Sequence, residues 1–267
     1  MKFHGRVTIY GEYLADLTDV LCLPTKSYSS TKIFEDNLTN TYNRKLDMVA
    51  TFFSGRGLKS ADLIYSNIVY EYGLSSSTVL ALLHAYTNTN DFEEIKKIVN
   101  ESDKIFHGFD PSGMDFYSVY HSSAGLYRAN KWCGVKIMPF YSLFIQLPKE
   151  HKIALDVVQN TILDKPQGLI EISNQLTQKI TTSGKLDLKL LLAYCRELAI
   201  KNVYSESAKK LISQLLETNV AAKGVGGLYD KLILVTGESE SEIAIAKNLA
   251  REFKCRIYDS PIMFSEE

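Results

Sequence analysis

The chain has 267 residues, of which 45% are hydrophobic and 23% are charged, an ordinary composition for a globular protein of one large or two modest domains. With 30 basic and 31 acidic residues the formal net charge is -1, so no overall field attracts nucleic acid or an anionic membrane. The N-terminal apolar run is too short for a signal peptide, and no later segment is long enough to span a membrane. We therefore expect a cytoplasmic protein that binds neither nucleic acid nor membrane.

The residues that most often bind metals are scattered along the chain. Its four cysteines, Cys22, Cys133, Cys195 and Cys255, form no CxxC pair, which argues against a metal knuckle or a disulfide scaffold. The five histidines are equally dispersed. We interpret them as turn or surface residues rather than as metal ligands.

The first half of the chain is predicted to be rich in strands. Alternating apolar residues predict a strand over 3–13, and a second strand over 20–24 stops at a proline. Helical spacing of apolar residues predicts helices over 60–72 and, after three serines, over 75–86. A short amphipathic helix is expected over 91–102, followed by strands over 117–129, 134–138 and 141–147.

After Pro148 helical patterns dominate, over 151–163, 168–180, 187–201 and 205–217. The chain then closes with a predicted strand over 231–237, a helix over 239–253 and a last strand over 255–260. This change from strand-like to helical sequence patterns predicts two domains, residues 1–148 and 149–267.

Three consecutive serines open the predicted helix at 75–86, in the stretch Gly73, Leu74, Ser75, Ser76 and Ser77. The start of a helix presents unpaired N–H groups and the positive end of the helix dipole, so this turn is suited to holding phosphate. The alternative is a plain serine N-cap on a core helix. A Walker A loop is excluded, because no Gly-Lys-Ser/Thr follows.

Two further turns carry residues that suit phosphate chemistry. Asp115 follows a tight Pro-Ser-Gly bend, and Asp103 lies upstream, so that one acid could bind a metal while the other polarises a hydroxyl. The alternative is an ordinary surface turn, since such residue pairs are common there. The glycines Gly224, Gly226 and Gly227 form either a phosphate-facing loop or a tight connection into the next strand.

Taken in order, the segments GRVTIYGEY, GLSSSTV, DPSGMDFYSVYHSSAGLYR and KGVGG resemble the GHMP kinase family, most of all its mevalonate kinase and phosphomevalonate kinase branch. That family has the motifs GKVxLxGEH, PxGxGLGSSAA, PSGxDN and KxxGAGxGG in the same order along its chain. The resemblance implies an α+β fold of two domains with the active site in the cleft between them. The N-terminal, nucleotide-binding half would resemble the second domain of a small-subunit ribosomal protein, and the helix-rich C-terminal half would be ferredoxin-like.

The resemblance also implies roles for single residues. Ser77 matches the serine that the family uses on magnesium, and Asp103 matches its metal-binding glutamate. Asp115 falls on the acid that acts as general base or polarises the acceptor, and Arg6 falls where mevalonate kinases have a lysine. Glu12 keeps the acid of the GEH motif and is assigned to the substrate.

The nucleotide phosphates would lie on the serine motif, Gly73 to Ser77, and on the loop of Gly224, Gly226 and Gly227. The implied function is an ATP- and Mg²⁺-dependent kinase that phosphorylates a hydroxyl of a small polar metabolite, mevalonate-like or sugar-like. The sequence departs from the family by having fewer glycines in both phosphate motifs. This departure keeps open a second function, a catalytically silent relative that binds a ligand or a protein partner.

Overall fold

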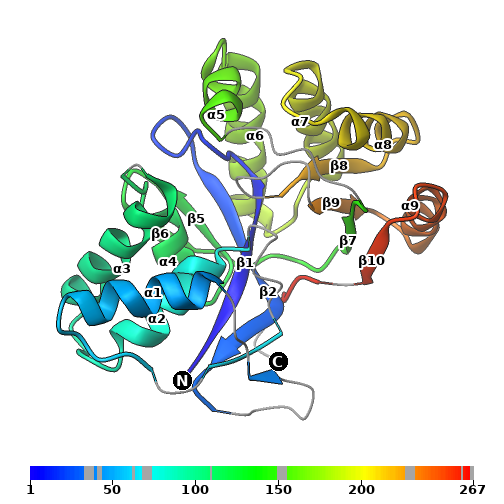
Figure 1. Cartoon of the computed structure of the whole chain (residues 1–267). Coiled ribbons are helices and arrows are strands. Elements are labelled where there is room, and N and C mark those ends of the chain that lie inside the picture. Colours follow the sequence, from blue (N-terminus) through cyan, green and yellow to red (C-terminus); the bar gives the residue numbers. More distant parts are fainter. Residues whose placement is uncertain are drawn as a thin grey trace.

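The computed structural model of the chain describes residues 1–32, 39–40, 44–61, 64–67, 74–108, 110–148, 155–225, 232–259 and 261–264. These residues form a mixture of helices and two antiparallel sheets, which confirms the expected α+β class (Figure 1). Within the described ranges, no helix combines the length and the apolar character that crossing a membrane requires.

The first sheet belongs to the N-terminal half. Its strands follow the order β3–β4–β2–β5–β6, and β1 also pairs with β2. The two long strands are β1 (Lys2–Tyr10) and β2 (Val20–Ser30), and the short ones are β3 (Thr39–Asn40), β4 (Tyr65–Ser66), β5 (Gly125–Arg128) and β6 (Lys131–Gly134).

Four helices lie beside this sheet, namely α1 (Arg44–Gly55), α2 (Ser76–Ala85), α3 (Phe92–His107) and α4 (Met114–His121) (Figure 1). Helices α2 and α4 pack on β1, and α2 also contacts α1 and α3. Every residue of α2 is buried, the polar Ser76, Ser77, Thr78 and His84 included. The start of α2 is thereby held against β1, where the candidate site lies.

The second sheet has the order β10–β7–β9–β8 and is also antiparallel. Its strands are β7 (Tyr141–Gln146), β8 (Ala221–Gly224), β9 (Leu232–Gly237) and β10 (Arg256–Asp259). The accompanying helices are α5 (Leu155–Leu163), α6 (Gln167–Ser183), α7 (Leu188–Ile200), α8 (Glu206–Glu217) and α9 (Glu240–Glu252), all close to the ranges predicted from the sequence. Because β7 pairs with β9 and β10, this sheet takes one strand from before residue 148; the domain boundary itself stays a prediction.

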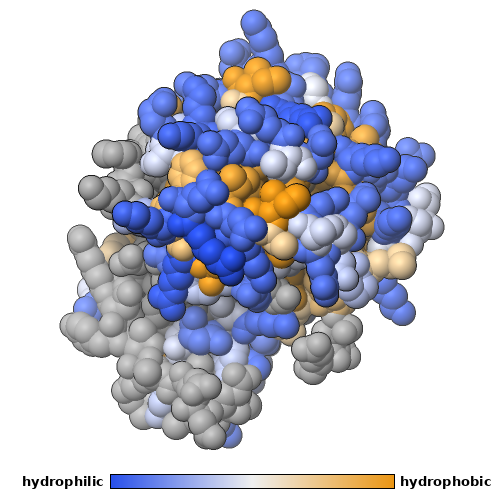
Figure 2. Space-filling model, turned by 90° about the vertical axis from the view of Figure 1, so that its right-hand side faces the viewer, coloured by the Kyte–Doolittle hydropathy of each residue, from blue (hydrophilic) through white to orange (hydrophobic). Residues whose placement is uncertain are grey.

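One hydrophobic core joins the two halves. It contains Val7 and Ile9 of β1 together with Leu191 of α7 and Val235 of β9. Seen from the side of α9 in Figure 1, the surface is mostly hydrophilic, with a limited group of apolar side chains near its middle (Figure 2).

Several predictions for the first half were wrong. The second strand, predicted to stop at Pro24, continues to Ser30, and of residues 134–138, predicted to be a strand, only Gly134 belongs to one. Residues 65–66, predicted to be helical, form β4, and residues 117–121, predicted to be extended, belong to α4. The alternating aromatic residues of this second segment look like a strand, but Phe116 lies 5.5 Å from Phe92 and 5.4 Å from Tyr120, ring centre to ring centre. Packing of one helical face against α3 therefore decides the structure of this segment.

His84 corrects the interpretation of the histidines as turn or surface residues. It lies on α2 with only 1% of its surface exposed, beside the ring of Phe53 at 5.2 Å. Its Nδ1 accepts a hydrogen bond from the backbone N–H of Ala61 at 2.8 Å. Burial lowers the pKa of His84 from 6.5 to about 4, so the folded protein keeps this ring neutral.

This burial predicts a loss of stability in mild acid. The pKa of His84 is about 4 when folded and near its ordinary 6.5 when unfolded, so between these values the unfolded chain binds the extra proton. The stabilisation present above pH 6.5 should therefore fall by about 2 kcal/mol between pH 7 and pH 5. Urea unfolding at both pH values checks this. His84→Asn keeps an acceptor for Ala61 and should lose less stability on acidification; an equal loss would contradict the assignment.

Candidate active site

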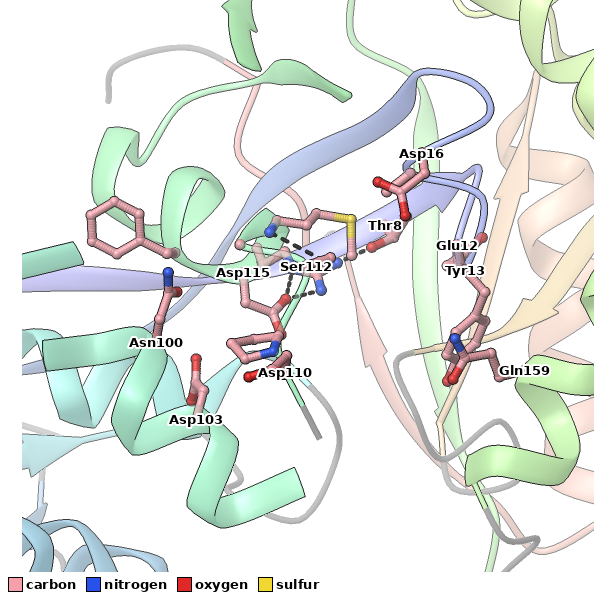
Figure 3. Close-up of a pocket in the computed structure, with 16 residues that line it drawn as sticks. Thr8, Glu12, Tyr13, Asp16, Asn100, Asp103, Asp110, Ser112, Asp115 and Gln159 are labelled. Carbon is pink, nitrogen blue, oxygen red and sulfur yellow. Dashed lines mark hydrogen bonds and ion pairs between the residues drawn. The ribbon is translucent and has the colours of Figure 1, made fainter. Parts of the chain in front are cut away.

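A cavity of about 290 Å³ opens where β1 meets α3, α4 and α5 (Figure 3). Most of the residues that line it are polar or charged, and they come from both halves of the chain. The lining includes Arg6 and Thr8 from β1, Glu12, Tyr13 and Asp16 from the turn that follows, Asn100 and Asp103 from α3, Ser112 to Asp115 from the start of α4, and Gln159 from α5.

The centre of the site is an ion pair between Arg6 and Asp115. The Nε of Arg6 donates to Oδ1 of Asp115 at 2.6 Å, and Nη2 donates to the same oxygen. The remaining arm, Nη1, donates to Oγ1 of Thr8. Burial lowers the pKa of the Arg6 guanidinium, while nearby groups, among them Asp103, oppose this effect. The two residues that the resemblance assigned to catalysis are thus in direct contact.

The turn before α4 explains how Asp115 reaches β1. Gly113 precedes the helix with a φ of 82°, and a Cβ there would lie 3.0 Å from Oδ1 of Asn130. This backbone conformation is one that glycine adopts without strain. It places Asp115 in the first turn of α4, where the helix dipole also favours a carboxylate.

The serine triplet does not cap its helix. Ser75 adopts a left-handed conformation with φ 56° and makes no side-chain capping bond to α2. Its Oγ donates instead to Oδ1 of Asp115 at 2.9 Å. Ser76 and Ser77 are buried in the first turn of the helix, and Gly73 lies outside the described residues. The plain N-cap interpretation is therefore wrong, and the serine motif lies against the predicted catalytic acid.

Asp103 lines the side of the cavity that α3 provides and is 2% exposed. Its Oδ2 accepts a hydrogen bond at 2.7 Å from Oγ1 of Thr78, the residue after Ser77. Across the described ranges, no three His, Cys, Asp or Glu side chains are grouped as a metal centre. Mg²⁺ usually takes one or two protein carboxylates and completes its shell with phosphate and water, and the carboxylate of Asp103 fits this requirement.

Glu12 lines the cavity but is also tied to the second sheet. It forms an ion pair with Lys223 of β8, and Nζ of Lys223 donates to the backbone carbonyl of Thr8 at 2.9 Å. The exposed fractions of Glu12 and Lys223 are 4% and 1%. Lys223 directly precedes Gly224, the end of β8, whereas Gly226 and Gly227 lie outside the described residues.

Several of these site residues were missed from the sequence. Lys223 stands at the lysine of the family motif KxxGAGxGG, a signal that was present but was considered only for its glycines. Thr78 directly follows the serine motif, but its hydrogen bond to Asp103 was not predicted. Asp16 and Gln159 line the cavity without any motif that would have singled them out, whereas Tyr13 stands at the histidine of the GEH motif.

No family model and no curated protein matches the sequence. Solved structures do match over nearly the whole chain. The mevalonate kinase of Leishmania major in complex with R-mevalonate has a TM-score of 0.73 at 12% identity, covering 100% of this chain and 96% of its own. The phosphomevalonate kinase of Streptococcus pneumoniae has a TM-score of 0.71 at 14% identity, covering 98% of each chain.

A further structure of the pneumococcal kinase holds phosphomevalonate and AMPPNP and matches with a TM-score of 0.68 at 14% identity, covering 98% of this chain and 99% of its own. At these identities the likeness shows the fold and not the activity. The chain therefore has the GHMP kinase fold in its mevalonate-kinase-like form, as the order of its motifs predicted.

Proposed function

We propose that this protein is a kinase that transfers the γ-phosphoryl group of ATP, with Mg²⁺, to a hydroxyl of a small polar metabolite. The observation that carries the proposal is the position of Asp115. Arg6 and Ser75 hold its carboxylate at the wall of a cavity that Asp103 also lines. This brings an acid, a fixed cation and the start of a helix to one place, the parts that phosphoryl transfer needs.

Asp115 is suited to orienting the acceptor hydroxyl. Three donors, two from Arg6 and one from Ser75, converge on its Oδ1 and stabilise the carboxylate form. Its other oxygen, Oδ2, takes part in none of these three hydrogen bonds and would accept one from the hydroxyl of the phosphoryl acceptor. Arg6 would contribute electrostatically by holding Asp115 in its charged form, since a guanidinium keeps its proton.

The phosphates would lie at the start of α2, where unpaired N–H groups and the helix dipole favour anions. Asp103 would hold Mg²⁺ together with phosphate oxygens, and Ser77 would be a second ligand from the same turn of the helix. The bound Mg²⁺ would supply charge neutralisation for the transferred phosphoryl group. The solved pneumococcal relative, which holds AMPPNP, supports an adenine nucleotide as the donor.

The charges of the cavity favour a neutral, sugar-like acceptor over a mevalonate-like one. The lining includes five acids, Glu12, Asp16, Asp103, Asp110 and Asp115, but Arg6 is its one basic residue among those described. The charge of Arg6 is already used by Asp115. No described lining residue therefore offers a cation to the carboxylate or phosphate of an anionic acceptor.

A catalytically silent relative is the second candidate. The sequence observation that favours it is the replacement of glycines by Leu228 and Tyr229 in the last motif. Fewer glycines leave less room for the backbone to approach a triphosphate. The two candidates differ in turnover, so the experiments below measure nucleotide binding and turnover separately.

MgATP should stabilise the folded protein against heat, because a ligand that binds only the native state adds RT ln(1 + [L]/Kd) to its stability. At a hundred times Kd this amounts to about 2.7 kcal/mol. Differential scanning fluorimetry with ATP, GTP and ADP in the presence of magnesium measures it. A melting temperature that none of the three nucleotides shifts would refute the nucleotide site.

Asp115→Asn should lower kcat by roughly a hundredfold or more while the nucleotide Kd changes little, because the amide keeps the size of the side chain but lacks the charge. The measurements are ADP release and nucleotide titration on the same preparation. Asp164→Asn, an exposed acid at the end of α5, is the matched control and should behave as wild type. Turnover that survives in Asp115→Asn would remove this residue from the mechanism.

A panel of acceptors tests the proposed charge preference. Neutral sugars should give a kcat/KM at least tenfold above that of mevalonate or phosphomevalonate, since the described lining offers no free cation. Replacing the exposed Asp16 by Lys should raise kcat/KM for the anionic acceptors and leave the neutral ones nearly unchanged. A wild-type preference for mevalonate would overturn the sugar-like assignment without affecting the kinase proposal.

A further inference from the structure

A buried polar chain runs from the Arg6–Asp115 pair to the second sheet. Arg6 donates to the side chain of Thr8, and the carbonyl of Thr8 accepts from Lys223 at 2.9 Å. Lys223 is also paired with Glu12, just beyond the end of β1. The chain thus leads from β1 to β8, a strand 215 residues away from Thr8 in the sequence.

Tyr194 of α7 adds a third contact to the same segment. Its hydroxyl accepts from the backbone N–H of Gly11 at 2.9 Å and lies 3.4 Å from Oε2 of Glu12, to which it donates. Burial raises the pKa of Tyr194, so this hydroxyl remains a neutral donor. The end of β1 is therefore held at Thr8, Gly11 and Glu12 by two residues of the second half.

The cost of burying these charges needs an explanation. Lys223 and Glu12 are at least 96% buried, and burial together with the charge of Arg6 lowers the pKa of Lys223. A buried ion pair adds little net stability, because removing both ions from water costs about as much as their attraction returns. Apolar side chains of similar size would hold β1 against β8 at least as firmly, so stability alone does not account for the pair.

We propose that Lys223 and Glu12 are positioning residues that fix the end of β1, and through Thr8 the guanidinium of Arg6, relative to Asp115. The inference rests on the proposed kinase function for its catalytic consequence, but its geometric part is independent of it. Arg6 and Thr8 project from the same side of β1, two residues apart, so a displacement of the carbonyl of Thr8 also moves the hydroxyl that holds Nη1. Misplacing a catalytic group by about 1 Å typically costs a hundredfold in rate.

The experiment separates positioning from stability by removing the charges singly and together. Lys223→Met leaves the Glu12 carboxylate buried without its cation and should lower the melting temperature strongly. The double variant Lys223→Met with Glu12→Gln removes both charges and should recover most of that loss. Lys185→Met, at an exposed position before α7, is the matched control for the loss of a lysine.

For the double variant we expect a kcat at least tenfold below wild type, with the nucleotide Kd within about twofold of it. In its crystal structure the guanidinium of Arg6 should have left its two-donor contact with Asp115. A double variant with wild-type kcat would show a merely structural pair and overturn the proposal. Should wild type turn over no acceptor, the kinase proposal fails, and an unmoved Arg6 in the double variant would still refute the positioning role.

Discussion

The site depends on one constraint, that the buried guanidinium of Arg6 must have all its arms occupied. A buried cation is tolerated only where charge and hydrogen bonds compensate its loss of water. Asp115 supplies the charge, Thr8 accepts from the third arm, and Ser75 completes the group by donating to Asp115. Because these four residues come from β1, the start of α2 and α4, this requirement fixes how the two helices meet the strand.

The charges of the cavity bear on the proposed binding of a divalent cation. Asp115 is paired with Arg6, Glu12 with Lys223 and Asp110 with Lys104, and the buried Asp103 accepts a hydrogen bond from the hydroxyl of Thr78. In the proposed function, the carboxylate of Asp103 would bind a divalent cation at the α3 side of the cavity. The acceptor end would remain nearly neutral or acidic, which is the basis of the predicted preference for neutral acceptors.

The helices of the second half were predictable from the sequence, because each buries one face at regular helical spacing. Residues 117–121 were not, because aromatic side chains suit a strand and a packed helix equally and the contact with Phe92 decides between them. The roles of Arg6, Asp103 and Asp115 were predicted from the order of the motifs, and all three residues line one cavity. The pairing of Lys223 with Glu12 could not be predicted, since it joins residues far apart in the chain that only the fold brings together.

Whether an arginine or a lysine suits each position follows from the arrangement of the acceptors that the side chain has to reach. Arg6 has to reach Asp115 and Thr8 at once, and a planar fork with separated donors does this where a single ammonium would satisfy one partner at a time. Lys223 has to bring a carboxylate and a carbonyl together at one point, for which a compact ammonium is sufficient. Thr8 stands between them, because its hydroxyl accepts from Arg6 and its carbonyl accepts from Lys223, so this one residue links the second sheet to Arg6.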